Sequence, residues 1–224
     1  MLSSGPLLRG RRIEPEILDD TPPDQSRGSL GDLVRINRVF GGHAVLKRTL
    51  STVLRAGEMF TMLDVGAASG DVGARVRRWY PRATVTSLDY RVHHLAGALP
   101  PRVCADAFVL PFRQRSFDIV HCSLFLHHFE DERIIGLLRS FGRVARRFVA
   151  VTDLERHPLA YYAVPLTRWL FRWDPITLHD APISVAAGFH VPELRRLAEA
   201  AGARVISIRT YRPAFRVALL YSET

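Results

Sequence analysis

The sequence predicts a doubly wound α/β domain whose seven-stranded, mostly parallel sheet ends in an antiparallel C-terminal strand. Three observations predict it. An apolar run from Met59 leads through a small-residue turn into a helix, strands and helices then alternate up to residue 152, and two strand-like segments close the chain. Alternation of this kind builds an open sheet covered on both faces, with ligands bound at the carboxyl ends of its strands.

The expected strands are short and separated by turn residues. After the first strand at Met59, we expect strands at Thr84–Leu88, Val103–Ala105, Ser116–Ser123, Phe148–Thr152, Arg204–Tyr211 and Ala214–Tyr221. The helices expected between them are Val72–Trp79, Arg91–Ala98, Asp131–Phe141 and one that begins at Pro192 and ends before Gly202. Arg212-Pro213 separates the last two strands, which predicts a terminal antiparallel pair.

Composition sets the domain organisation. The 224 residues are 47% hydrophobic and 24% charged, which suits one globular domain with a substantial core. We expect a partly ordered N-terminal arm at 1–29, because that stretch has no sustained period, and a single domain at 30–224. Within the domain we expect two leading helices in 30–57, Leu30–Phe40 and His43–Ala56, and an aromatic, Pro-rich insertion at 154–191.

Several classes of function are disfavoured. No apolar run approaches the length of a membrane span, and the first residues do not form a secretory signal, so we expect a cytoplasmic protein without a membrane span. Cys104 and Cys122 lack metal-type spacing and are expected to be reduced core residues, with no metal bound. The net charge of +9 comes from dispersed arginines without interleaved stacking aromatics, so no nucleic-acid partner is predicted.

The turn after the first strand is the first candidate binding element. It consists of Gly66, Ala67, Ala68, Ser69 and Gly70. Because none of these side chains is large, backbone N–H groups can approach a ligand closely. The turn also opens a helix, whose N-terminus favours a carboxylate or another electron-rich group.

Two carboxylates follow at the ends of later strands. Asp89 ends the second strand, where a carboxylate accepts hydrogen bonds from both hydroxyls of a bound ribose. Asp106 ends the third strand, where it can accept a bond from an adenine amino group, with Ala107 and Tyr90 packed on the faces of the ring. The alternative for each aspartate is a turn or a helix cap.

At this point the sequence resembles the class I S-adenosylmethionine-dependent methyltransferases, in particular the small-molecule type called methyltransferase type 11. The resemblance covers roughly residues 59–153 and is carried by LDVGAASGD, SLDY, ADAFVLPF and SFDIVHCSLFLHHF. Ala68 replaces the usual middle glycine of the first motif. Since alanine disfavours positive φ, the turn survives if this position is not left-handed. A hydride-transferring dinucleotide-binding domain is the weaker alternative, because Asp71 stands where GxGxxG requires its third small residue.

The resemblance implies roles for the candidate residues. Asp64 and the backbone of Gly66, Ala67 and Gly70 would hold the methionine part of S-adenosylmethionine. Asp89 would hold the ribose, and Asp106, Ala107 and Tyr90 the adenine, with Ser123 lining the same site. The insertion at 154–191 would form the acceptor pocket and lid, and its aromatics suit a flat, apolar acceptor.

His127 and His128 are the candidate catalytic residues. Both follow the fourth strand, and a histidine near neutral pKa is suited to remove the proton of a phenol or acid acceptor. Adjacent side chains diverge, so at most one of the two is expected to face the site. His179 and Asp180, expected in a loop, are second choices, and His121 inside the strand is expected to be a buried structural residue.

The sequence therefore predicts methyl transfer from S-adenosylmethionine to a small, aromatic or polyketide-like molecule, with oxygen as the favoured acceptor atom. Two alternatives remain open. One is a carbon-methylating enzyme acting on a quinone- or lipid-like precursor, and the other is a non-catalytic cofactor-binding partner subunit. The partner expected is a small-molecule acceptor, with the protein a monomer or a homodimer.

Overall fold

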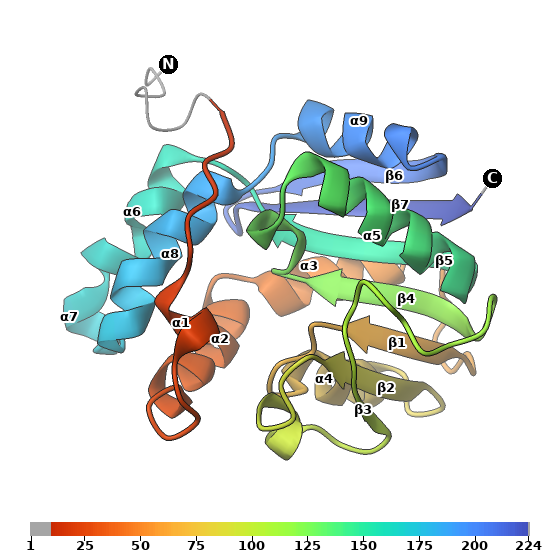
Figure 1. Ribbon diagram of the computed structural model, residues 1–224, viewed down its shortest axis with the longest axis horizontal. Coiled ribbons are helices and arrows are strands. Elements are labelled where there is room, and N and C mark those ends of the chain that lie inside the picture. The colour runs from red at the N-terminus through yellow and green to blue at the C-terminus, as the bar shows by residue number, and fades with distance from the viewer. Residues whose placement is uncertain (1–9, 224) are drawn as a thin grey trace.

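The computed structural model describes residues 10–223, which form a mixed seven-stranded sheet with helices on both faces (Figure 1). The strands lie in the order β3-β2-β1-β4-β5-β7-β6. Their bounds are β1 Thr61–Val65, β2 Thr84–Asp89, β3 Arg102–Cys104, β4 Phe117–Ser123, β5 Ala145–Leu154, β6 Ala203–Tyr211 and β7 Arg216–Glu223. Strands β1 to β5 pair in parallel, whereas β7 is antiparallel to both β5 and β6. The predicted fold class is confirmed.

The helices fall into three groups. Their bounds are α1 Ile17–Asp20, α2 Arg27–Val39, α3 Gly42–Leu50, α4 Asp71–Trp79, α5 Asp131–Val144, α6 Pro158–Leu166, α7 Arg168–Phe171, α8 Pro175–Ala187 and α9 Val191–Ala200. Helices α5 and α9 cover one face of the sheet and α3 and α4 the other. Helices α1, α2, α6, α7 and α8 gather beyond the tips of the parallel strands (Figure 1).

The core explains why the two faces are stable. Leu137 of α5 and Leu194 of α9 are fully buried against the sheet in one apolar cluster, and Leu50 of α3 and Val76 of α4 are fully buried in another. Burying one such side chain is worth about 1.5–3 kcal/mol. These two layers fix the sheet and therefore the positions of the strand ends.

Several local expectations differ from the structure. The second leading helix ends at Leu50 rather than near Ala56, and the expected helix at 91–98 is a 3₁₀ turn at His94–Gly97. Cys122 is buried, but Cys104 is exposed, because β3 lies at the edge of the sheet. His179 and Asp180 lie in α8 rather than in a loop. No helix among residues 10–223 has the length and apolarity needed to cross a bilayer.

Candidate active site

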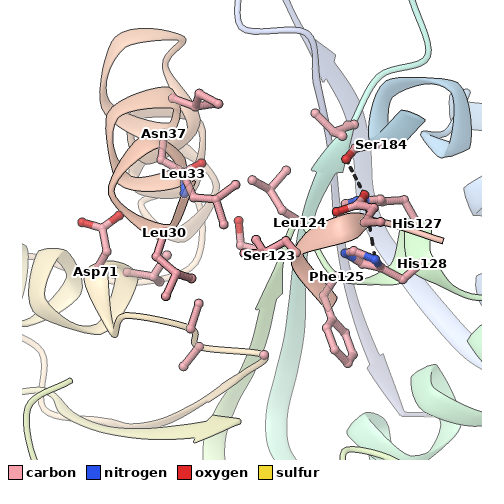
Figure 2. A pocket seen from close by; sticks show the side chains of 18 of the residues that line it. Leu30, Leu33, Asn37, Asp71, Ser123, Leu124, Phe125, His127, His128 and Ser184 are labelled. Carbon is pink, nitrogen blue, oxygen red and sulfur yellow. Dashed lines mark hydrogen bonds and ion pairs between the residues drawn. The ribbon is translucent and has the colours of Figure 1, made fainter. Parts of the chain in front are cut away.

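A cavity of about 700 Å³ opens at the carboxyl edge of the sheet. Its walls come from the turn after β1, the ends of β2 and β4, helices α1 and α2, the inner sides of α6 and α8, and the β6–β7 hairpin. Figure 2 shows His127, His128 and Ser184 on one wall and Leu30, Leu33 and Asn37 of α2 on the opposite wall. The volume suits a small-molecule site.

Nearly all the predicted site residues line this one cavity. They are Asp64, Gly66, Ala67, Asp89, Tyr90, Asp106, Ala107, Ser123, His127 and His128. The exception is Gly70. A Cβ built on this glycine would lie 2.4 Å from the Cβ of Ala98, so its missing side chain allows the turn to pack against the 3₁₀ segment. Gly70 thus shapes the turn without lining the cavity.

The turn between β1 and α4 uses three left-handed residues. Gly66 and Gly70 have φ of +67° and +71°, which glycine adopts at no cost. Ala68 has φ of +43°, so this position is left-handed and the turn forms although an alanine occupies it. Its N–H donates to Oδ2 of Asp89 at 2.9 Å, and this bond holds the alanine in an unfavourable conformation.

Asp64 lies at the base of the turn, and only one of its two carboxylate oxygens is hydrogen-bonded within residues 10–223. Its Oδ1 is 2.8 Å from Nδ1 of His121, a fully buried residue of β4 whose other ring nitrogen lies 3.3 Å from Oγ1 of Thr152. Oδ2 of Asp64 is buried and has no hydrogen-bond partner among the described residues. A buried carboxylate oxygen without a partner is costly, and a ligand with an N–H or O–H donor would satisfy it.

Asp89 is already hydrogen-bonded inside the protein. Its carboxylate accepts from the backbone N–H groups of Ala68 and Arg91 and lies 3.2 Å from Nδ1 of His94. Burial raises the pKa of Asp89, but the bonds to His94 and to the two N–H groups outweigh it, so the pKa is lowered. His94 also lines the cavity, and its Nε2 is buried without a hydrogen-bond partner among residues 10–223. His94 is a site residue that the motif reading missed.

The residues expected at an adenine ring have different surroundings in the cavity wall. Oδ1 of Asp106 accepts from the backbone N–H of Phe108 at 2.9 Å, which is the turn role considered as the alternative for this aspartate. Ala107 is buried, and Tyr90 is exposed at the rim. The ring of Phe108 packs edge-on against Phe129 at 5.1 Å.

His127 and His128 both line the cavity, so the expectation that only one faces the site is wrong. They lie in the 3₁₀ segment Leu126–His128, where the backbone does not alternate as a strand does. Their rings are stacked, with centroids 4.3 Å apart and planes at 29°.

The N-terminal arm supplies a carboxylate that the sequence did not reveal. Oε1 of Glu16 is 3.6 Å from Nε2 of His127 and 3.9 Å from Nδ1 of His128, and it accepts a short hydrogen bond from Ser184. Arg11 holds the arm in place by donating to Asp131 and to the carbonyls of Phe129 and Ala187. The arm was expected to be only partly ordered and offered no motif, so Glu16 was not a candidate.

The two histidines differ in charge because their charged neighbours differ. Nδ1 of His127 lies 2.7 Å from Oδ1 of the fully buried Asp153. Burial lowers the pKa of His127, but Asp153 and Glu16 outweigh it and raise the pKa to about 9. Burial and the charge of His127 lower the pKa of His128. At neutral pH, His127 is therefore a cation and His128 is neutral.

Glu16, His127 and His128 also bring three potential metal-ligand atoms within 4.8 Å of one another. The ion pairs of His127 with Asp153 and Glu16 account for this arrangement without a metal. The pKa of Glu16 is lowered accordingly: burial opposes the effect, but the interactions with His127, His128 and Ser184 outweigh it.

The half of the cavity beyond the histidines is mostly apolar. Its lining from the insertion consists of Leu154, Ala160, Ala163, Val164, Ala181, Ser184 and Val185. The insertion's aromatic side chains do not line the cavity, contrary to expectation; aromatic rings in its lining, among them Phe40, Phe125 and Phe215, come from other segments. The second-choice candidates His179 and Asp180 do not line the cavity. Asp180 accepts hydrogen bonds from the backbone N–H groups of Ile17 and Leu18 and caps α1.

Comparison with known proteins gives a consistent result. A protein-family model described as "Methyltransferase domain" matches residues 63–147. The chain is 30% identical to a demethylmenaquinone methyltransferase of Roseiflexus sp. (strain RS-1), over 62% of this chain and 66% of that protein. It is 28% identical to the protein of the same name from Roseiflexus castenholzii, with the same coverage. The chain thus spans slightly less than two thirds of the length of these relatives.

Solved structures share the fold at lower identity. A SAM-dependent methyltransferase from Aquifex aeolicus superposes with a TM-score of 0.60 at 16% identity, covering 90% of this chain and 98% of that one. CalO1, a methyltransferase of calicheamicin biosynthesis in its SAH-bound form, gives a TM-score of 0.59 at 20% identity, covering 83% of this chain and 54% of that one.

Proposed function

We propose that the chain is a class I S-adenosylmethionine-dependent methyltransferase, which the matching family model and the relatives support, and that it methylates a small, hydroxyl-bearing aromatic or polyketide-like molecule on oxygen. The observation that carries the proposal is a single cavity that joins the strand-end carboxylates Asp64 and Asp89 to His127 and His128. Such a cavity can hold a methyl donor and an acceptor end to end.

One part of the cavity, lined by Asp64, Asp89, His94 and the turn after β1, is called the cofactor half. Its polar groups suit those of S-adenosylmethionine. Oδ2 of Asp64 and Nε2 of His94 are buried and unpartnered among residues 10–223. A ligand with amino and hydroxyl groups supplies partners to both. We propose that Asp64 and the backbone at Gly66 and Ala67 hold the methionine part and that Asp89 holds the ribose. Asp106, Ala107 and Tyr90 would hold the adenine, with Ser123 beside them.

When bound, the cofactor supplies an electrophilic methyl group on a positively charged sulfur. The protein must then align the acceptor and remove its proton. His128 is the proposed base, because it is neutral at neutral pH. Its Nδ1 faces Oδ2 of Asp19 at 3.8 Å and Oε1 of Glu16 at 3.9 Å, so a proton taken up by its ring is stabilised by two carboxylates.

His127 has a different proposed role. It is held as a cation between Asp153 and Glu16 beside the place where the acceptor oxygen loses its proton. A fixed positive charge there stabilises the negative charge that develops on that oxygen. His127 therefore acts by electrostatics and not as the base.

Methylation of a ring carbon in a quinol-like acceptor is the second candidate function. The relatives named above, which are demethylmenaquinone methyltransferases, favour it. Removing a hydroxyl proton also activates the neighbouring ring carbon, so the same His128 serves either reaction.

Two measurements test the proposal. Isothermal titration with S-adenosylmethionine and S-adenosylhomocysteine should show binding, and mass spectrometry of phenolic and quinol acceptors should show a product heavier by one methylene. NMR of that product with an isotope-labelled methyl group separates an ether from a C-methyl compound. Absence of cofactor binding refutes the proposed function.

A further inference from the structure

Buried polar atoms without a hydrogen-bond partner concentrate around the cavity. Among the described residues, six side-chain atoms are of this kind, and four belong to residues that line it: Asn37 Oδ1, Asp64 Oδ2, His94 Nε2 and Arg216 Nη2. Arg216 differs from the other three because it is a strong cation and belongs to β7, which β4 and β5 separate from β1 in the sheet. Its side chain is only 4% exposed.

Arg216 lies at the acceptor end of the cavity. It is the first residue of β7 and pairs with Leu154, the last residue of β5, at the carboxyl edge of the sheet. The neighbouring cavity wall consists of Leu154, Ala214 and Phe215. The cation is therefore surrounded by apolar lining and backbone.

The protein does not neutralise Arg216 by direct contact. Its Nη1 has only long contacts, of 3.4 and 3.5 Å, to the carbonyls of Ala214 and Phe215. No ion pair within 4.0 Å is formed with any carboxylate of residues 10–223. Asp153 acts on it only at longer range, since its oxygens accept from His127 and from the backbone N–H groups of Phe125, Leu126 and Leu154.

Arg216 nevertheless stays charged. Burial lowers the pKa of Arg216 to about 10, partly offset by Asp153, so the guanidinium is protonated at neutral pH. Leaving a buried cation without a hydrogen-bonding anion is strongly unfavourable. A planar carboxylate is the partner whose geometry matches a guanidinium.

We propose that Arg216 binds a carboxylate of the acceptor, which makes the acceptor an aromatic acid with a separate hydroxyl group at the histidines. This inference deepens the proposed function and rests on it only for the statement that the occupant is methylated. A neutral quinol lacks such a carboxylate, so the inference also favours methylation of an acid over that of a quinol.

Binding of benzoate and benzamide to the full chain tests the inference without any methyl transfer. These probes share shape and size but differ in charge. We expect benzoate to bind at least about tenfold more tightly than benzamide, because one hydrogen bond to a charged group changes affinity by about tenfold. Arg216→Met should remove the preference. Arg209→Met removes a positive charge from the exposed part of the same hairpin and should keep it.

Thermal melting separates ligand binding from a structural role. Arg216→Met should melt at the same or a higher temperature, because a well-packed apolar side chain replaces an unpaired buried charge. A lower melting temperature together with an unchanged preference for benzoate would overturn the inference. Equal or undetectable binding of both probes to the unmodified protein would overturn it too, whether or not Arg216→Met folds. Titration with S-adenosylhomocysteine tests the proposed function separately, since Arg216 is not among the residues proposed to hold the cofactor.

Discussion

The ion pair of His127 and Asp153 predicts a pH-dependent stability of the fold. Replacing His127 by Asn keeps a donor near the position of Nδ1, 2.7 Å from Asp153, but removes the titrating charge. The folded pKa of His127 is about 9, against an ordinary value of 6.5. Each pKa unit corresponds to about 1.36 kcal/mol, so the pair contributes about 3 kcal/mol to the free energy of unfolding.

The sign follows from the direction of the shift. Because the folded pKa is raised above the unfolded one, the contribution is fully present below pH 6.5 and is lost as the pH rises through about 9. The lowered pKa of Asp153 describes the same pair from its other side and is not counted again. The free energy of unfolding of the unmodified protein, relative to His127→Asn, should therefore fall by about 3 kcal/mol between pH 6.5 and pH 9.5.

Urea denaturation at a series of pH values measures this difference. Buried Cys122 also affects stability at alkaline pH, because burial raises the pKa of its thiol, but it is present in both proteins and cancels. His128→Asn is the matched control. The pKa of His128 is lowered, so removing this side chain should leave the fall in the free energy of unfolding at alkaline pH in place. Parallel pH profiles for the unmodified protein and His127→Asn would refute the assignment of His127 as a buried cation.

Three further predictions concern the cofactor turn and the proposed base. Ala68→Gly should raise the free energy of unfolding by about 0.5–1 kcal/mol in thermal melts, because glycine removes the cost of a φ of +43°. Ala67→Gly, where φ is not positive, should lower the free energy of unfolding. A stabilising Ala67→Gly and a destabilising Ala68→Gly would contradict this account of the turn. Asp89→Ala should weaken binding of S-adenosylhomocysteine by about 1–3 kcal/mol in calorimetry, and unchanged affinity in a folded variant would count against the ribose role. His128→Asn should abolish the acidic limb of the pH–rate profile, whereas His179→Asn, outside the cavity, should leave it intact; a retained limb would assign the proton transfer elsewhere.

The sheet and the cofactor half could be read from the sequence because local patterns specify them. The buried strand Thr61–Val65, the small-residue turn and Asp89 at the end of the next strand lie within 29 consecutive residues, 61–89. Parallel pairing of neighbouring strands then brings them together. Local patterns could not predict the conformation of Ala68. A hydrogen bond from its N–H to Asp89, a residue of the next strand, holds it at positive φ.

The acceptor half could not be read in the same way. Its polar groups come from segments far apart in the chain: Glu16 from the arm, His127 after β4, Ser184 from α8 and Arg216 from β7. Glu16 lies in a stretch without periodicity, so no pattern marked it. Arg216 did leave a signal. It is the third residue of an apolar segment, AFRVALLY, and begins β7, a strand that is buried along nearly all its length.

The two halves of the cavity therefore carry different information about function. In the half proposed to hold the cofactor, the carboxylates Asp64, Asp89 and Asp106 stand in short motifs of the sequence, LDVGAASGD, SLDY and ADAFVLPF. In the acceptor half, the charges are buried side chains of separate elements, and apolar replacements at such positions would often be no less stable. Arg216 is 4% exposed and has no direct counter-ion among residues 10–223, and we attribute its burial to the carboxylate that it is proposed to bind. The class of acceptor must accordingly be inferred from those side chains and their unsatisfied atoms rather than from the motifs of the family.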